Sequence, residues 1–102
     1  MRKLTFIISV FTICSCKKEP AAPLPVANFY VDNAFCITPC QVKFFDQSYS
    51  AVGWKWYFGN SLTSHKKNDS SLYHTPGLYN VSLAVWNSDG IRDSVTKQIQ
   101  LY

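Results

Sequence analysis

Charge is scarce in this sequence. Only 16% of its 102 residues are charged, and aromatic residues make up another 16%. This composition is typical of a folded chain rather than a disordered one, and the length suits one small domain. From Cys16 onward, which leaves out Arg2 and Lys3, 8 basic residues stand against 6 acidic ones. Lys17 and Lys18 account for this surplus, so no basic stripe remains to bind nucleic acid.

The sequence also lacks any pattern typical of catalysis or metal binding. No serine stands in a G-x-S-x-G motif. The only histidines are His65 and His74, and no ligand spacing surrounds them. The aspartates are scattered, whereas a calcium site needs several oxygens from one loop. We therefore expect no catalytic residue, no bound metal and no cofactor, and we predict that the chain is not an enzyme.

Helical periodicity is missing as well. From residue 26 onward, short alternating segments are separated by turn residues, which predicts an all-β sandwich. The clearest alternation places Trp54, Trp56 and Phe58 on one side of a strand, and Lys55 and Tyr57 on the other. We expect the first three in the core. Other strands are predicted at 26–30, 41–46, 62–65, 71–73, 79–85 and 91–102.

One charged residue conflicts with the alternation of the last predicted strand. Val95, Ile99 and Leu101 share the inward phase of that strand, and Lys97 falls in the same phase. The pattern therefore requires either a bulge at this point or a lysine whose aliphatic stem is buried while its ammonium group reaches out.

The one long apolar run, Leu4–Ile13, is too short to cross a bilayer, which takes about 20 residues. It follows a basic start and has the length of the apolar core of a signal peptide. The run ends in Ile13-Cys14-Ser15-Cys16, which resembles the lipobox of bacterial lipoproteins. The resemblance implies cleavage before Cys16 and acylation of Cys16 with chains such as palmitate. A secreted protein cut nearby is the alternative.

Acylation with more than one chain would anchor the protein stably in a membrane. Lys17 follows the lipidated cysteine, and the absence of Asp at this position implies, by analogy with known lipoproteins, sorting to the outer membrane. The predicted organisation is a signal peptide over residues 1–15, a lipidated cysteine with a Pro-rich tether over 16–25, and one β-sandwich domain over 26–102. The predicted location is the cell envelope.

Cys36 and Cys40 lie in a Pro-containing loop. An exported chain meets an oxidising environment, so we predict a disulfide between them. Their C-x3-C spacing is neither a C-x2-C redox motif nor half of a zinc site with a visible second half. Two free thiols are the alternative. By the chain-entropy model, so short a closed loop contributes about 2 kcal/mol.

Several motifs together resemble one known family. Thr38-Pro39 precedes Val42-x-Phe44-x-Asp46, Trp54-x-Trp56-x-Phe58-Gly59 follows, and Tyr73-x-x-Pro76-Gly77-x-Tyr79 leads through alternating apolar residues to Asn87-x-x-Gly90. These motifs resemble the PKD (polycystic kidney disease) domain, with its central W-x-W-D-F-G-D-G, over residues 29–101. The resemblance implies an immunoglobulin-like sandwich of two sheets that serves as an interaction or spacer module.

The sequence departs from the family pattern in the middle of the chain. Tyr57 replaces the usual Asp, Asn60-Ser61 replaces Asp-Gly, and Ser71 stands where a His is common. We therefore expect the turn after the tryptophans to be altered. Any role of the family's acidic residues does not carry over to these positions.

Lys55, Tyr57 and Trp86 form the predicted ligand face. Alternation places them opposite to the core residues, and their two strands are neighbours in an immunoglobulin-like sandwich. Exposed aromatic rings can stack on sugars or anchor a protein partner. In the alternative interpretation, Trp86 packs under the Asn87–Gly90 hairpin and Tyr57 is an ordinary cross-strand residue.

Taken together, these patterns predict a membrane-anchored bacterial lipoprotein with one non-catalytic protein-interaction or spacer domain. The expected partners are the membrane, through the lipid anchor, and a protein of the envelope. The alternative is a carbohydrate-binding module that holds cell-wall or external glycan against Tyr57 and Trp86.

Overall fold

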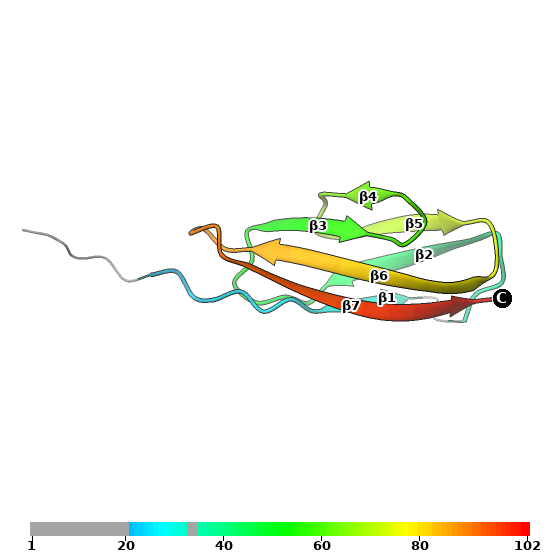
Figure 1. Ribbon diagram of the computed structural model, residues 1–102, viewed down its shortest axis with the longest axis horizontal. Helices are drawn as coiled ribbons and strands as arrows, with labels where there is room; N and C mark the ends of the chain where they lie inside the picture. The colour runs from blue at the N-terminus through cyan, green and yellow to red at the C-terminus, as the bar shows by residue number, and fades with distance from the viewer. Residues whose placement is uncertain (1–20, 33–34) are drawn as a thin grey trace, which may run out of the picture.

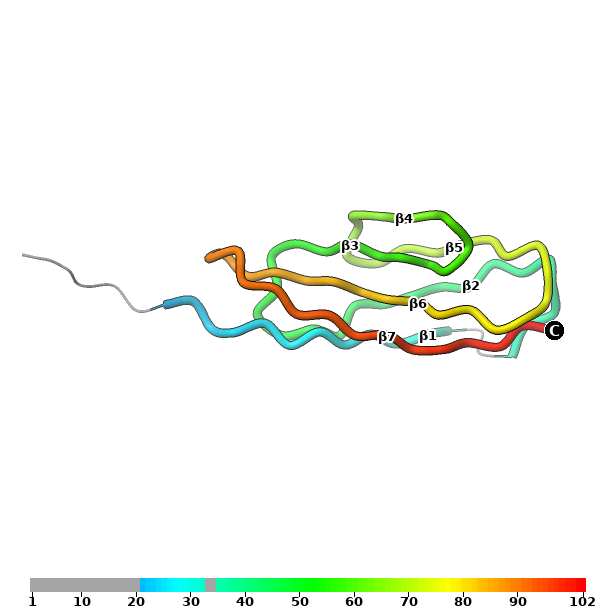
Figure 2. The backbone as a smooth tube through the Cα atoms, in the orientation of Figure 1, coloured from blue at the N-terminus to red at the C-terminus, as the bar shows by residue number. Residues whose placement is uncertain are grey.

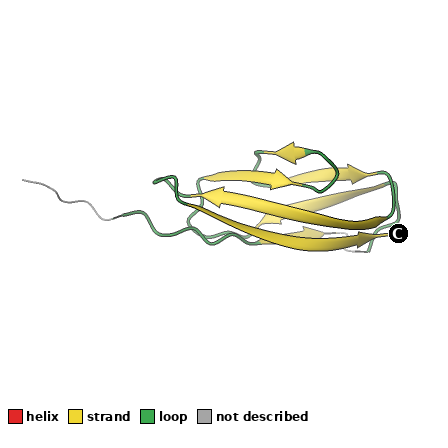
Figure 3. Cartoon of the chain, viewed as in Figure 1, coloured by secondary structure: helices red, strands yellow, loops and turns green. Residues whose placement is uncertain are grey.

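The computed structural model describes residues 21–32 and 35–102, and within them the chain consists of strands and loops (Figure 3). The predicted signal peptide, Cys16 and residues 17–20 of the tether lie outside the described residues. In the part of the chain that is described, no helix is long and apolar enough to cross a membrane.

The described residues form seven antiparallel strands in two sheets (Figure 1). One sheet has the order β1-β2-β5 and the other the order β4-β3-β6-β7. This arrangement confirms the predicted all-β sandwich. The strands are β1 (Phe29–Asp32), β2 (Cys40–Asp46), β3 (Gly53–Tyr57), β4 (Thr63–Ser64), β5 (Asp69–Tyr73), β6 (Gly77–Trp86) and β7 (Arg92–Leu101).

The first strand begins three residues later than predicted. Val26 makes only an isolated bridge to Tyr49, and regular pairing with β2 starts at Phe29. The Ser48 hydroxyl explains the interruption, because it accepts the N–H of Asn28 and donates to its carbonyl oxygen. The Asn28 N–H therefore bonds to a side chain, while its carbonyl oxygen also accepts the Gln47 N–H at 2.9 Å.

Alternation along β2, β3 and β6 fills the core between the sheets. Trp56 is fully buried. The centroid of its ring lies 5.1 Å from that of Phe29 and 5.6 Å from that of Phe44. Phe58 lies 5.2 Å from Phe44 on the other side of the cluster. Trp54 points inward as predicted but is only partly buried against this core. The fully buried aliphatic residues are Val42, Val81, Leu83 and Val85.

Lys97 keeps its place in β7 without a bulge. The pairing of β6 with β7 runs without a break from Gly77 opposite Leu101 to Trp86 opposite Arg92. The Lys97 ammonium donates to the Phe29 carbonyl oxygen at 2.6 Å and lies 5.0 Å from the centre of the Phe29 ring. The bulge alternative is therefore wrong. Lys97 keeps the inward phase of β7 while remaining exposed, and its ammonium group reaches across to the backbone of β1.

The two ends of the sandwich carry different connections. The N-terminal segment enters at the end that holds the β2–β3 and β6–β7 connections, whereas the β1–β2 loop and the C-terminus lie at the opposite end (Figures 1 and 2). The N-terminal segment is bonded to the β6–β7 hairpin. The Ala22 N–H donates to the Asp89 carboxylate at 3.0 Å, and the Asn87 amide donates to the Pro23 carbonyl oxygen at 2.9 Å.

Candidate functional site

The predicted ligand face lies on the outer surface of the four-stranded sheet. In the pairing of β3 with β6, Gly53 lies opposite Trp86, Lys55 opposite Ala84, and Tyr57 opposite Ser82. Since directly opposite residues point to the same side of a sheet, Lys55, Tyr57 and Trp86 share one face. The structure therefore brings the three predicted residues to one surface.

The two aromatic rings of this face are not adjacent. Four residues separate their levels along β6, which corresponds to about 13 Å. The Trp86 indole lies across Gly53, where an added Cβ would overlap the ring, and the Arg92 guanidinium is 4.7 Å from its centre. Trp86 is therefore half-buried between a backbone and a cation, and is not an open platform.

Tyr57 is more accessible than Trp86. It is 44% exposed, and the Lys55 ammonium lies 5.4 Å from the centre of its ring. Each aromatic ring on this face thus has a cation as a neighbour. A ligand that stacks on either ring must share it with that cation or displace it.

Hydroxyl and amide groups occupy the surface of β6 and β7 beside the two rings. The Ser82 and Thr96 hydroxyls are 2.7 Å apart, and the Gln98 amide donates to the Asn80 side-chain oxygen at 3.2 Å. We call these four residues the polar strip. Neutral groups of this kind can exchange hydrogen bonds with sugar hydroxyls or with a partner's backbone.

A second surface was not predicted from the sequence. Phe35, Ile37 and Tyr102 are 75%, 69% and 49% exposed, and the rings of Phe35 and Tyr102 lie 4.9 Å apart. We call these three residues the apolar tip. The sequence does contain a signal for it, because Phe35 and Ile37 flank Cys36 in a loop without continuing the alternation of a strand.

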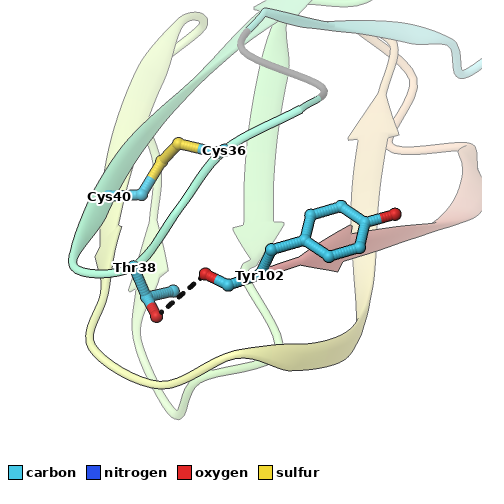
Figure 4. Close-up of a disulfide and its surroundings, with 4 residues drawn as sticks. All are labelled: Cys36, Thr38, Cys40 and Tyr102. Carbon is cyan, nitrogen blue, oxygen red and sulfur yellow. Dashed lines mark hydrogen bonds between the residues drawn. A yellow bond between two sulfur atoms is a disulfide. The ribbon is translucent and has the colours of Figure 1, made fainter.

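The apolar tip is braced on two sides (Figure 4). Cys36 and Cys40 form the predicted disulfide, with their Cα atoms 6.1 Å apart. The Thr38 N–H donates to the Tyr102 carbonyl oxygen at 2.7 Å, and the Tyr102 N–H donates to the Cys36 carbonyl oxygen at 2.9 Å. These contacts tie the loop to the last residue of the chain and hold three apolar side chains at the surface.

One surface groove has a volume of about 560 Å³, and its lining residues include Asn60, Tyr73, His74 and Tyr79. The Tyr73 phenol donates to the Phe58 carbonyl oxygen at 2.6 Å. Burial, together with the nearby Tyr79, raises the pKa of this phenol above its usual range. Within residues 21–32 and 35–102, no group of three or more His, Cys, Asp or Glu side chains could hold a metal ion.

Comparison with known proteins identifies the family. The profile of the PKD domain matches residues 21–101, most of the chain. This chain belongs to the PKD domain family. PKD domains are generally non-catalytic modules. No curated protein matches the chain in sequence.

Solved structures agree with this PKD assignment. The first PKD domain of Vibrio anguillarum Epp is 29% identical over 79% of this chain and 96% of its own, with a TM-score of 0.68. The corresponding domain of the Vibrio cholerae metalloprotease PrtV is 27% identical over 76% and 95%, with a TM-score of 0.65. A structure described as a carbohydrate-binding module of the β-sandwich superfamily is 25% identical over 80% of this chain and 36% of its own, with a TM-score of 0.72.

The departures of this PKD domain from the family pattern are linked in space. The Asn60 amide donates to the Ser71 hydroxyl at 2.8 Å and to the Leu72 carbonyl oxygen at 3.1 Å. Ser61, which stands where the family has Gly, has a φ of 74°. Ser61 thus has the left-handed backbone that suits glycine, and Asn60 and Ser71 form a polar pair beside it.

Proposed function

We propose that this PKD domain is a lipid-anchored protein-interaction module of the bacterial cell envelope, and that the apolar tip is its contact surface. The observation that carries the proposal is the position of the tip. Three exposed apolar side chains are held by a disulfide and by backbone hydrogen bonds at the end opposite to the N-terminal segment. A module anchored at its N-terminus would present this end to a partner.

The chemistry of the tip favours a protein with an apolar recess. Residues 35–39 contain no charged side chain, so few polar groups would lose water on binding. Aromatic side chains that are already ordered bury a large area at a small cost in conformational entropy. The bracing by Cys36–Cys40 and by Tyr102 supplies this order before the partner arrives.

A photo-crosslinking residue at Ile37 tests the tip in intact cells. We expect a specific adduct that disappears when Phe35→Asp is added, because the neighbouring charge would have to be buried on binding. The same crosslinker at Leu72, which is exposed on β5, is the control. Equal adducts from both positions, or an adduct that survives Phe35→Asp, would contradict the proposal.

The lipid anchor has its own test. We expect Cys16→Ala to move the protein from the membrane fraction to the soluble envelope fraction, because the acyl chains supply the stable part of membrane binding. The control is Cys14→Ala, since Cys14 leaves with the predicted signal peptide. Retention of the Cys16→Ala protein in the membrane fraction would remove the lipoprotein proposal.

The second candidate function is glycan binding by the outer face of the four-stranded sheet. It is favoured by the polar strip beside Tyr57 and Trp86, and by the similarity to the β-sandwich carbohydrate-binding module. Titration with peptidoglycan fragments and polysaccharides, followed by tryptophan fluorescence, tests it. A saturable change that is lost in Trp86→Ala and weakened in Tyr57→Ala would support glycan binding. No change with any sugar would leave the protein partner as the function.

A further inference from the structure

The N-terminal segment enters the sandwich at the end that holds the β2–β3 and β6–β7 connections (Figure 2), and these segments carry exposed apolar side chains. They come from the N-terminal segment, from the β2–β3 connection and from the β6–β7 hairpin. Each is between 43% and 70% exposed. We call this set the membrane-proximal pole, and its members are Leu24, Val26, Tyr49, Val52 and Ile91.

Backbone hydrogen bonds hold the pole in place. Val26 and Tyr49 exchange two of them, at 3.1 Å and 2.9 Å. The Val52 N–H donates to the Trp86 carbonyl oxygen at 2.8 Å, and the Asn87 N–H donates to the Ile91 carbonyl oxygen at 3.0 Å. All three segments are thus joined to each other or to a strand end, so the apolar residues form part of the fold.

The length of the tether places this pole near the anchor. Only five peptide steps join Cys16 to Ala21, and a fully extended chain of that length spans about 18 Å. The residues that follow are bound to the β6–β7 hairpin, Ala22 by Asp89 and Pro23 by Asn87. An acylated Cys16 therefore cannot lie farther than this from the start of the folded chain, whereas the apolar tip is separated from it by the length of β6 and β7.

We infer that the membrane-proximal pole rests on the lipid bilayer that holds Cys16. This inference relies on the proposed anchor. Aromatic and aliphatic side chains suit the boundary between headgroups and acyl chains.

Two carboxylates near the pole accept hydrogen bonds from the N-terminal segment. The Asp89 carboxylate accepts the Ala22 N–H at 3.0 Å, and the Asp93 carboxylate accepts the Ala27 N–H at 2.8 Å. Each therefore holds the N-terminal segment against the sandwich. The pole presents its apolar residues to the lipid, and the domain stands with its long axis away from the membrane.

The experiment uses the mature lipidated protein on vesicles of phosphatidylcholine and phosphatidylglycerol. A Val52→Cys variant provides one free thiol for a fluorescent dye, because Cys36 and Cys40 are bridged. The matched control is Leu78→Cys, which is exposed at the start of β6, far from the hairpin. Lipids that carry a nitroxide near the headgroup quench a dye that touches them, and co-sedimentation with the vesicles reports the anchor.

We expect the dye at position 52 to be quenched about tenfold more strongly than the dye at position 78, because Val52 and Leu78 lie near opposite ends of β6, a strand of about 30 Å. Adding Tyr49→Asp to the Val52→Cys protein should lower quenching to the level of the control while co-sedimentation stays unchanged. Equal, weak quenching at both positions in a protein that sediments would overturn the membrane contact and leave the anchor standing. A protein that does not sediment would overturn both. Concentration-dependent protection of the dye without vesicles would identify a second copy as the occupant and overturn the contact.

Discussion

At the scale of single residues, the aromatic cluster depends most on Trp56. Its ring contacts Phe29, Phe44 and Phe58, and its indole N–H donates to the Lys66 carbonyl oxygen at 2.9 Å. We expect Trp56→Ala to lower the free energy of unfolding by about 3–5 kcal/mol, because it opens a cavity that the two sheets cannot close. Urea denaturation measures the loss. A loss below about 1 kcal/mol would mean that the core is centred elsewhere.

A substitution at Ser61 should stabilise the domain, in contrast to Trp56→Ala. Its φ of 74° lies in the left-handed region, which costs an L-residue roughly 1–2 kcal/mol. We expect Ser61→Gly to raise the free energy of unfolding by about 0.5 kcal/mol, since the relief of strain exceeds the added chain entropy of glycine. Ser88→Gly, at a hairpin position with no positive φ, is the control and should destabilise. Thermal unfolding compares the two.

At the scale of secondary structure, β7 protects the outer edge of β1. Two inward-facing charges reach across, since the Lys97 ammonium binds the Phe29 carbonyl and the Asp93 carboxylate binds the Ala27 N–H. Inward-pointing charges at an edge hinder pairing with another chain. The polar residues that disturb the alternation of β7 are thus part of its structural role.

The substitution Lys97→Met removes the ammonium group and keeps an apolar side chain of similar length, so it tests the contribution of the charge alone. Methionine can keep the apolar contact with the Phe29 ring, but it leaves the Phe29 carbonyl without its donor. We expect a loss of about 1 kcal/mol in the free energy of unfolding, and faster amide hydrogen exchange in β1. Gln98→Met, on the outer face of the same strand, should change neither by much. Unchanged exchange in β1 would show that the ammonium does not hold this edge.

At the scale of the whole molecule, the sequence predicted the layers better than the ends. Period-two alternation places Trp56, Val81 and Val85 in the core, because burial on one face of a strand leaves a local pattern. The shared face of Tyr57 and Trp86 followed from the expected neighbouring strands. The strands and their buried faces were therefore predictable from local sequence, whereas their arrangement in two sheets came from the resemblance to the PKD domain.

The ends of the sandwich depend on contacts that leave no local pattern. Thr38 meets Tyr102, and Asn87 meets Pro23, each across 64 residues of sequence. Nothing near Phe35 or Ile37 in the sequence indicates that the chain end ties their loop at the surface. Likewise, nothing in the Pro-rich segment indicates that part of it is bonded to the β6–β7 hairpin. The sequence leaves Phe35 and Ile37 outside any strand pattern, but the contacts that hold the apolar tip and the membrane-proximal pole in place became visible only in the structure.

Asn87 holds the N-terminal segment against the β6–β7 hairpin. It is only 3% exposed. Its side-chain oxygen accepts the N–H groups of Asp89 and Ile91, and its amide donates to the Pro23 carbonyl oxygen. The substitution Asn87→Asp keeps the acceptor of the hairpin and replaces the donor to the tether with a group that repels a carbonyl oxygen.

We therefore expect Asn87→Asp to release the N-terminal segment while the hairpin remains. Loss of this buried hydrogen bond should cost about 1–3 kcal/mol. NMR relaxation should report increased motion at Ala22 and Leu24, with the amides of Asp89 and Ile91 still protected. Asp89→Asn, which keeps an oxygen acceptor for the Ala22 N–H, is the milder control. If Ala22 and Leu24 stay ordered in Asn87→Asp, contacts other than the Asn87 amide hold the N-terminal segment against the hairpin.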